Sequence, residues 1–159
     1  MRSDADGAWR IVEDDLSGAS IRALLEVHFA GMLANSPAGS CHFLDFDGLR
    51  AGDVTFWSIH KGDELAGCGA LKRLDTTHGE IKSMRTAEAF LRQGVAARML
   101  GHIIDKARAR SFERLSLETG SGAAFEPALA LYRAHGFIDC EPFADYKSDP
   151  FSRFMTYTL

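Results

Sequence analysis

Residues 80–118 contain a strand, a helix and a second strand in direct succession, and this unit narrows the choice of fold more than any other feature. Residues 80–85 and 114–118 have the short, partly alternating apolar pattern of strands,. Between them, from Gly94 to Ala107, apolar residues recur every three or four positions, which is typical of a helix with one buried face,. Two strands joined by a helix pair in parallel with a right-handed crossover. The sequence therefore predicts a sheet with at least one parallel pair.

The segments around this unit predict further strands and two more helices. A hairpin is expected over residues 54–74, around the turn Lys61-Gly62-Asp63,. Residues 17–20 are expected to cap a helix, and 36–53 has the composition of a loop with one helical turn around 43–49,. This order of elements predicts the α/β class, with a mixed sheet covered by helices on its faces. In chain order we expect strands at 9–12, 54–59, 64–74, 80–85, 114–118, 137–140 and 154–157, and helices at 21–32, 94–107 and 128–135.

Composition and charge exclude several classes of protein. The 159 residues are 46% hydrophobic and 25% charged, as in ordinary globular domains, so we expect one domain over residues 1–159,. With 18 basic and 22 acidic side chains the net charge is −4, which argues against a general nucleic-acid-binding protein,. The segment 80–114 is an exception, because it holds 8 basic and 4 acidic residues. Either a solvated helix face or a local anion-binding site would explain this excess.

The chain lacks the roughly 20 consecutive apolar residues of a membrane-spanning helix, and its first ten residues are polar,. Its three cysteines, Cys41, Cys68 and Cys140, form no CxxC pair, and no cysteine–histidine cluster has the spacing of a zinc site,. We therefore expect a reduced, cytoplasmic protein without a metal ion. In such a protein we expect the three cysteines to pack as small apolar residues rather than to act as nucleophiles.

The loop Arg92-Gln93-Gly94-Val95-Ala96-Ala97 precedes the helix of the central unit and has properties of a phosphate-binding loop. The first turn of a helix carries unpaired backbone N–H groups and partial positive charge, so it attracts anions. Small residues such as Gly94 and Ala96 leave room for a pyrophosphate to approach the backbone. Neither the Walker pattern of nucleotide hydrolases nor the GxGxxG pattern of dinucleotide-binding proteins is present,. Close packing of the helix on the sheet would explain the small residues equally well.

Two motifs in register resemble those of the GNAT superfamily of N-acetyltransferases. Residues 84–100 resemble its acetyl-CoA-binding motif, R/Q-x-x-G-x-G/A, and residues 128–137, ALALYRAHGF, resemble its A-x-x-L-Y-x-x-x-G-F signature. Their separation and the hairpin before them follow the order of the family over nearly the whole chain. Residues 64–71 and 78–85 are also similar to a bacterial, YsnE-type subgroup of these acetyltransferases.

The resemblance implies a GNAT-like fold, in which a central mixed, mostly antiparallel sheet contains one parallel βαβ unit and two splayed strands, with helices on both faces. It implies an acetyl-CoA-dependent N-acetyltransferase that acts on the amine of a small molecule by direct attack within a ternary complex. Pantetheine would enter between strands 80–85 and 114–118, and the backbone N–H of Met84 or Arg85 would polarise the thioester. The residues implied to hold the cofactor are Met84, Arg85, Arg92, Gln93, Gly94, Val95, Ala96, Ala97 and Tyr132.

Two positions depart from the family pattern. Leu91 stands where the family has an arginine or glutamine three residues before the first glycine of the loop. Phe125 stands where many members have an asparagine, seven residues before the signature tyrosine. These departures keep an alternative open, namely a non-catalytic acyl-CoA-binding or sensing domain with the same fold.

Tyr132 and Glu80 are the candidate catalytic residues. A phenol with a pKa of about 10 can protonate a leaving thiolate whose thiol has a pKa of about 8.5, although Tyr132 could equally belong to the core. Glu80 lies where the histone-acetylating branch of the superfamily has a base glutamate, and a carboxylate there could accept the proton of the amine. An ion pair with Lys82 or Lys72 is the alternative for Glu80, and Glu118 or solvent could be the base instead.

The resemblance implies that two loops, residues 36–53 and 141–153, wall the acceptor site. Both combine acidic and aromatic side chains, which suits a cationic amine with an apolar body,. Solvated acids beside core aromatic residues would explain the same composition. An exposed C-terminal strand could support a homodimer, and no nucleic-acid or membrane partner is expected.

Overall fold

The computed structural model describes residues 9–40 and 43–159, so Cys41 lies outside the described part of the chain. The strands and helices follow the predicted order, and the helical turn expected in the loop after the first helix is present as α3. The elements are β1 (Trp9–Glu13), α2 (Ala19–Asn35), α3 (Phe46–Leu49), β2 (Val54–Lys61), β3 (Glu64–Arg73), β4 (His78–Thr86), α4 (Val95–Ala109), β5 (Arg114–Thr119), α5 (Glu126–Ala134), β6 (Ile138–Asp139) and β7 (Arg153–Thr158), with single 3-10 turns at Glu88–Phe90 and Ala123–Phe125.

The described strands form one seven-stranded sheet in the order β1-β2-β3-β4-β5-β7-β6. β4 and β5 pair in parallel, and the other neighbouring pairs are antiparallel. α4 is the crossover between the two parallel strands. The predicted mixed, mostly antiparallel sheet with one βαβ unit is therefore confirmed.

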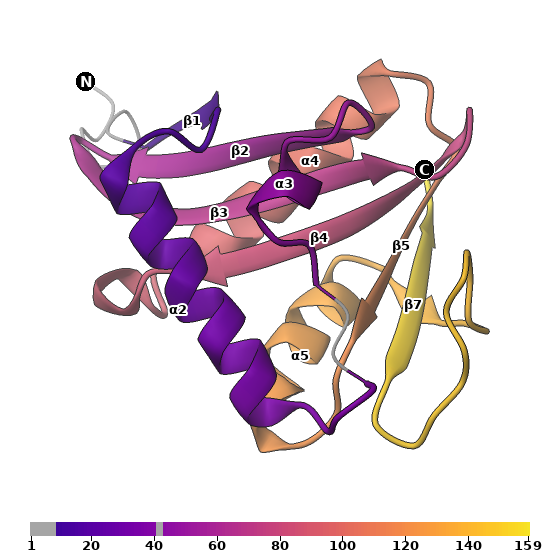
Figure 1. Ribbon diagram of the computed structural model, residues 1–159. Helices are drawn as coiled ribbons and strands as arrows, with labels where there is room; N and C mark the ends of the chain where they lie inside the picture. Colours follow the sequence, from indigo (N-terminus) through magenta and orange to yellow (C-terminus); the bar gives the residue numbers. More distant parts are fainter. Residues whose placement is uncertain (1–8, 41–42) are drawn as a thin grey trace.

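Helices cover both faces of the sheet, with α2 and α3 on one face and α4 and α5 on the other (Figure 1). Alternate residues of β3 point to opposite faces. Leu71 therefore joins Met99 and Ile103 of α4 in the larger core, which also includes residues of α5. Cys68 joins Leu25 of α2 in the smaller core.

The start of α2 differs from the expected capping. Gly18 occupies the N-cap position, and no side chain caps the helix. The hydroxyl of Ser17 donates instead to Oδ1 of Asp15 at 2.6 Å, so this local turn takes up the group that was expected to cap the helix,. α2 also extends to Asn35, beyond the predicted end at Met32.

The predicted strand over 137–140 is shortened to β6, which pairs only with Met155 and Thr156 of β7. Phe137 is buried in the larger core and so precedes the strand. β7 pairs with β5 along its whole length. β6 is therefore the last strand at this end of the sheet, outside β7. The homodimer that was expected through the C-terminal strand stays a prediction.

Cys68 is buried, and its Sγ donates to the backbone carbonyl of Ser83 at 3.3 Å. Burial raises the pKa of this thiol to about 12, so it stays protonated near neutral pH and is a poor nucleophile,. Cys140 is half-buried. Within residues 9–40 and 43–159, no group of three or more His, Cys, Asp or Glu residues is arranged to hold a metal ion. None of the described helices is both long and apolar enough to cross a membrane.

Candidate active site

β4 and β5 pair over only three residue pairs, and the last of these joins Glu80 to Ser116. Beyond this pair a cleft of about 160 Å³ lies between the two strands. Polar side chains hold the paired end together: Nε2 of His78 lies 2.6 Å from Oγ of Ser116, which lies 2.9 Å from Oγ1 of Thr156 on β7. The splayed strands that the resemblance implies are therefore present, and they separate directly after Glu80.

The cleft is open to groups from both faces of the sheet. His28 and Met32 of α2, with Phe43 after it, line one side, while Ala128 and Tyr132 of α5 line the other. Two molecules that approach from opposite faces could therefore meet between the strands.

β4 contains a bulge beside the cleft. The register with β3 pairs Arg85 with Cys68 and Lys82 with Ala70, so Ser83 and Met84 together oppose one residue, Gly69. Ser83 has a φ of 58°, a left-handed conformation that is uncommon outside glycine,. A bulge leaves backbone groups outside the ladder, and Met84 and Arg85 both line the cleft,. Backbone N–H groups of this segment are thus suitably located to bind an oxygen atom in the cleft.

The predicted phosphate loop leads into the 15-residue helix α4. Gly94 is its N-cap residue with a φ of 80°, and Arg92 also has a positive φ of 60°. A Cβ placed on Gly94 would meet no atom within 4 Å, so open space lies against the loop. The side chain of Val95 is buried in the core, so only its backbone can reach a ligand. Together, the exposed loop and the first turn of a long helix fit a diphosphate.

The side chain of Arg85 lies against α2. Its Nη2 donates to the carbonyl oxygen of Val27 at 3.4 Å, and a Cβ on Gly31 would lie only 2.9 Å from the same atom. Glycine at position 31 therefore leaves room for the guanidinium. The side chain therefore lies against this wall of the cleft, and the backbone N–H of Arg85 donates to the thiol of Cys68, which leaves Met84 as the candidate contact for the thioester.

Tyr132 is buried, with 6% of its surface exposed, and it lines the cleft. Its ring packs edge-on against Phe137 at 5.8 Å, so it also belongs to the core, and its catalytic role stays a prediction. Burial raises the pKa of its hydroxyl above the ordinary value, so the group keeps its proton at neutral pH,. Phe125, at the position of the family asparagine, lines the same cleft and packs against Phe151 at 5.4 Å.

Glu80 is only 3% exposed and accepts two hydrogen bonds through Oε2. Nζ of Lys82 lies 3.2 Å from this oxygen, and the hydroxyl of Tyr146 donates to it at 2.5 Å. Lys82 also donates to the hydroxyl of Tyr146 at 2.8 Å. The ion pair with Lys82 that was the alternative for Glu80 therefore exists. Burial, and then the neighbouring Glu80, raise the pKa of Tyr146, which holds its proton on the phenol.

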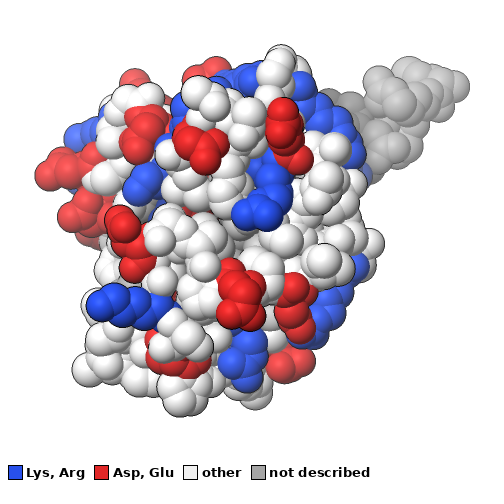
Figure 2. All heavy atoms as spheres, turned by 90° about the vertical axis from the view of Figure 1, so that its right-hand side faces the viewer, with Lys and Arg blue, Asp and Glu red and all other residues white. Residues whose placement is uncertain are grey.

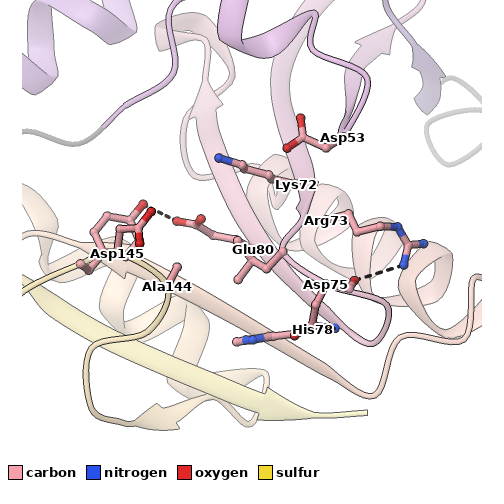
Figure 3. Close-up of a pocket in the computed structure, with 10 residues that line it drawn as sticks. Asp53, Lys72, Arg73, Asp75, His78, Glu80, Ala144 and Asp145 are labelled. Atoms are coloured by element: carbon pink, nitrogen blue, oxygen red, sulfur yellow. Dashed lines mark hydrogen bonds between the residues drawn. The ribbon is translucent and has the colours of Figure 1, made fainter.

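A larger pocket of about 580 Å³ lies beside Glu80, and its wall includes Asp53, Lys72 and Asp145 (Figure 3). Lys82 lines the narrow cleft, whereas Glu80 lines the larger pocket, so this ion pair separates the two spaces. On the side of the molecule turned to the viewer in Figure 2, acidic and basic side chains are interspersed and neither forms a continuous patch.

The two expected acceptor loops meet through Asp149, but this residue has a structural role. Its carboxylate accepts hydrogen bonds from the backbone N–H groups of Phe151 and Ser152, and from the hydroxyls of Ser152 and Ser40. These contacts, the Ser152 backbone first, lower the pKa of Asp149. Asp45 likewise caps α3, by accepting from the backbone N–H of Gly48. Part of the acidity of these loops thus stabilises turns.

We expect Asp149→Ala to lower the melting temperature by roughly 2–4 °C, because it removes the acceptor of these turn hydrogen bonds. Asp145→Ala, in the same loop but exposed, is the matched control and should leave the melting temperature unchanged. Because the pKa of Asp149 is lowered on folding, its contribution is present above the ordinary pKa of about 3.9 and is lost as pH falls through the folded value. The difference between wild type and Asp149→Ala should therefore narrow below about pH 4. Equal melting temperatures at pH 7 would contradict this role.

The structure brings some of the predicted site residues together and adds others. Met84, Arg85, Tyr132 and the rival base Glu118 share the narrow cleft, whereas residues 92–97 lie apart from it at the start of α4. His28 and Lys82 adjoin the cleft but were not predicted as site residues, whereas Tyr146 belongs to the loop 141–153 that was expected to wall the acceptor site. The periodicity of α2 marked residue 28 as buried, and no sequence signal indicated which cavity it would face.

A splayed parallel pair, a glycine-led helix after the first of its strands and a tyrosine facing the gap define the class of CoA-dependent acyltransferases. The Acetyltransferase (GNAT) family matches residues 21–137. The chain is 58% identical over 146 residues to the uncharacterized N-acetyltransferase YsnE of Bacillus subtilis, over 92% of this chain and 97% of that protein. It is 39% identical over 125 residues to an IAA acetyltransferase of Azospirillum brasilense, over 77% and 80% of the two chains. The chain belongs to the GNAT family of acetyltransferases.

Solved structures share the fold. An acyl-CoA N-acyltransferase of Klebsiella pneumoniae superposes with a TM-score of 0.77 at 27% identity, over 95% of this chain and 97% of that one. A GNAT acetyltransferase of Elizabethkingia anophelis with acetyl-CoA bound superposes with a TM-score of 0.67 at 19% identity, over 96% and 99%. Family membership makes this chain an acetyl-CoA-dependent N-acetyltransferase, which confirms the expected enzyme class and cofactor.

Proposed function

We propose that this enzyme transfers the acetyl group of acetyl-CoA to the amine of a small molecule, by direct attack within one ternary complex. One observation carries the proposal: the β4–β5 pairing stops at Glu80, and the cleft that opens there has Tyr132 on one side and the Lys82–Glu80 pair on the other. A candidate proton donor therefore lines this gap, and the candidate proton acceptor Glu80 lies directly behind Lys82.

The donor side rests on the backbone of two segments. The N–H groups at residues 92–97 bind the diphosphate, favoured by the positive end of α4. Bound acetyl-CoA supplies the thioester whose carbonyl carbon the amine attacks. The N–H of Met84 in the bulge donates to the carbonyl oxygen, whose charge grows in the transition state. No polar side chain is needed at Leu91, because the backbone makes the phosphate contacts.

Tyr132 then supplies the proton that the sulfur needs. Its hydroxyl faces the cleft from α5 and stays protonated at the working pH, because burial raises its pKa. As the C–S bond breaks, the hydroxyl donates its proton to the sulfur, and CoA leaves as the thiol. The phenol regains a proton from solvent when the products leave.

Glu80 accepts the proton that the attacking amine loses, through an intervening water molecule. Oε2 accepts hydrogen bonds from Lys82 and Tyr146, which hold the carboxylate in place. Glu118 on the opposite strand is the rival for this role. The acceptor is a compact molecule, which suits the small volume of the cleft. The face shown in Figure 2 has no continuous basic patch that would bind an extended polyanion.

The test of this function is the release of CoA thiol from acetyl-CoA in the presence of a panel of primary amines. We expect amine-dependent release together with the N-acetylated product in mass spectrometry. A non-catalytic acyl-CoA-binding domain would bind acetyl-CoA in calorimetry and release no thiol above the background rate.

Gly94→Val should weaken acetyl-CoA binding more than tenfold, which corresponds to about 1.4 kcal/mol. The branched side chain enters the open space against the loop and opposes the left-handed backbone conformation of Gly94. Gly62→Val is the matched control, because Gly62 also has a positive φ, of 60°, and open space around its Cβ, but lies in the β2–β3 turn. Calorimetry should give a wild-type dissociation constant for Gly62→Val. An unchanged constant for a folded Gly94→Val would move the diphosphate elsewhere.

A further inference from the structure

His28 is a polar residue in a position where an apolar one would pack without loss. It continues the buried stripe of α2 after Ile21 and Leu25, and only 6% of its surface is exposed. Nδ1 is buried and has no hydrogen-bond partner among the described residues. The ring also lines the narrow cleft. A buried polar ring on an apolar stripe costs free energy, and Nδ1 stays unpaired, so the ring can contact a ligand in the cleft only through its other nitrogen, Nε2.

The surroundings of the ring determine where its proton lies. Burial, and then the positive charge of Arg85, lower the pKa of His28 to about 4, so the imidazole is neutral near pH 7. A neutral imidazole has one N–H. On Nδ1 that hydrogen would be buried and without an acceptor among the described residues. Because buried unpaired N–H groups are rarer than unpaired acceptors, the hydrogen belongs on Nε2, at the edge of the ring that can meet the cleft.

The other polar groups on the same side of the cleft favour a negatively charged or carbonyl oxygen. Lys82 and Arg85 both line the cleft, and Glu118 is the acidic residue that lines it within the described chain. Lys82 has three N–H donors, of which two bind Glu80 and Tyr146,. Its third is available to a ligand. Met32 and Phe43, next to His28 on this wall, are apolar.

We propose that His28 is a specificity-determining residue, whose neutral Nε2–H donates a hydrogen bond to a carboxylate or amide oxygen that the acceptor carries next to its reacting amine. The acceptor class is then an α-amino acid or amino-acid amide with an apolar side chain, which packs against Met32 and Phe43. Lys82 binds the same oxygen group from the other side. This inference rests on the proposed function, because it concerns the acceptor of that reaction.

The test compares acceptors that share a side chain and have or lack this oxygen group, with rates expressed per neutral amine because the group also lowers the pKa of the amine. L-leucine and L-leucinamide carry it, whereas isopentylamine has the same side chain and amine without it. For wild type we expect kcat/KM to be at least tenfold higher with leucine and leucinamide than with isopentylamine. His28→Leu should remove this preference through a higher KM for the first two, while kcat with isopentylamine and KM for acetyl-CoA stay unchanged. Its melting temperature should be equal to or above that of wild type, because leucine leaves no unpaired nitrogen.

His102→Leu is the matched control, because His102 also has a buried nitrogen without a partner among the described residues but packs against Trp57 away from the cleft. It should keep the wild-type preference. Equal use of the three acceptors by wild type, or an equal loss for all three in His28→Leu, would overturn the proposal. A raised KM for acetyl-CoA in His28→Leu would assign the residue to the donor instead.

The proposed function and this inference fail in different ways. If no amine is acetylated, calorimetry on the CoA complex still compares leucine with isopentylamine. Tighter binding of leucine that is lost in His28→Leu would support the role of His28 alone, and equal binding would refute it.

Discussion

Tyr132→Phe is expected to lower kcat about 100-fold, the range in which loss of a general acid commonly falls. The substitution removes one hydroxyl and keeps the ring that packs against Phe137, so the dissociation constant of acetyl-CoA should change by less than about twofold,. Steady-state thiol release and calorimetry measure the two quantities. The loss belongs to kcat because proton donation matters only as the C–S bond breaks.

Tyr157→Phe is the matched control for Tyr132→Phe. Tyr157 also stacks on Phe137, at 5.2 Å, but its hydroxyl accepts a hydrogen bond from Arg108 on the helix α4. This variant should turn over at the wild-type rate. A folded Tyr132→Phe that works at full speed would reduce Tyr132 to a residue of the core, and the thiolate would then take its proton from solvent.

Glu80→Gln should lower kcat/KM about 100-fold at pH 7, and the difference from wild type should shrink as pH rises. At low pH the amine is protonated and depends on a group that removes its proton, whereas above its own pKa it is already neutral. Glutamine keeps the size of the side chain but cannot accept a proton. It also leaves Lys82 without its buried counter-ion, so melting temperatures must be measured alongside the pH–rate profiles,.

Tyr146→Phe tests the hydrogen bond to Glu80 independently of the negative charge of Glu80. It removes the hydroxyl that donates to the carboxylate and leaves the carboxylate in place. We expect a loss of about tenfold or less, without the strong pH dependence of Glu80→Gln. If Glu80→Gln gives a profile parallel to wild type at every pH, the base is Glu118 or solvent.

Much of the architecture follows from local sequence. The helical spacing of apolar residues in α4 and the alternation in the strands require only neighbouring residues, and they predict the parallel βαβ unit that is observed. The same holds for Gly94, because a loop that turns into a helix favours glycine at its left-handed position,. The family motif around Tyr132 also lies within a single helix and its C-terminal turn.

Helical spacing and strand alternation could not predict which side chains from distant segments pair with one another. The sequence left Lys72 and Lys82 as equal partners for Glu80, and the structure pairs Glu80 with Lys82 and with Tyr146, which lies 66 residues away. The sequence also could not distinguish two roles of the acidic loop residues. Asp149 accepts hydrogen bonds that stabilise a turn, whereas Asp145 faces a pocket.

The sequence by itself determined the class of fold, the glycine at the start of α4 and the tyrosine that faces the cleft. Only the tertiary structure decided where the parallel strands separate, and that His28, Lys82 and Tyr146 adjoin this point. The physical reason is the range of the interactions. Helix and strand patterns depend on residues a few positions apart, whereas the end of the β4–β5 pairing depends on sheet twist, on the bulge at Ser83 and on helices packed against both faces,.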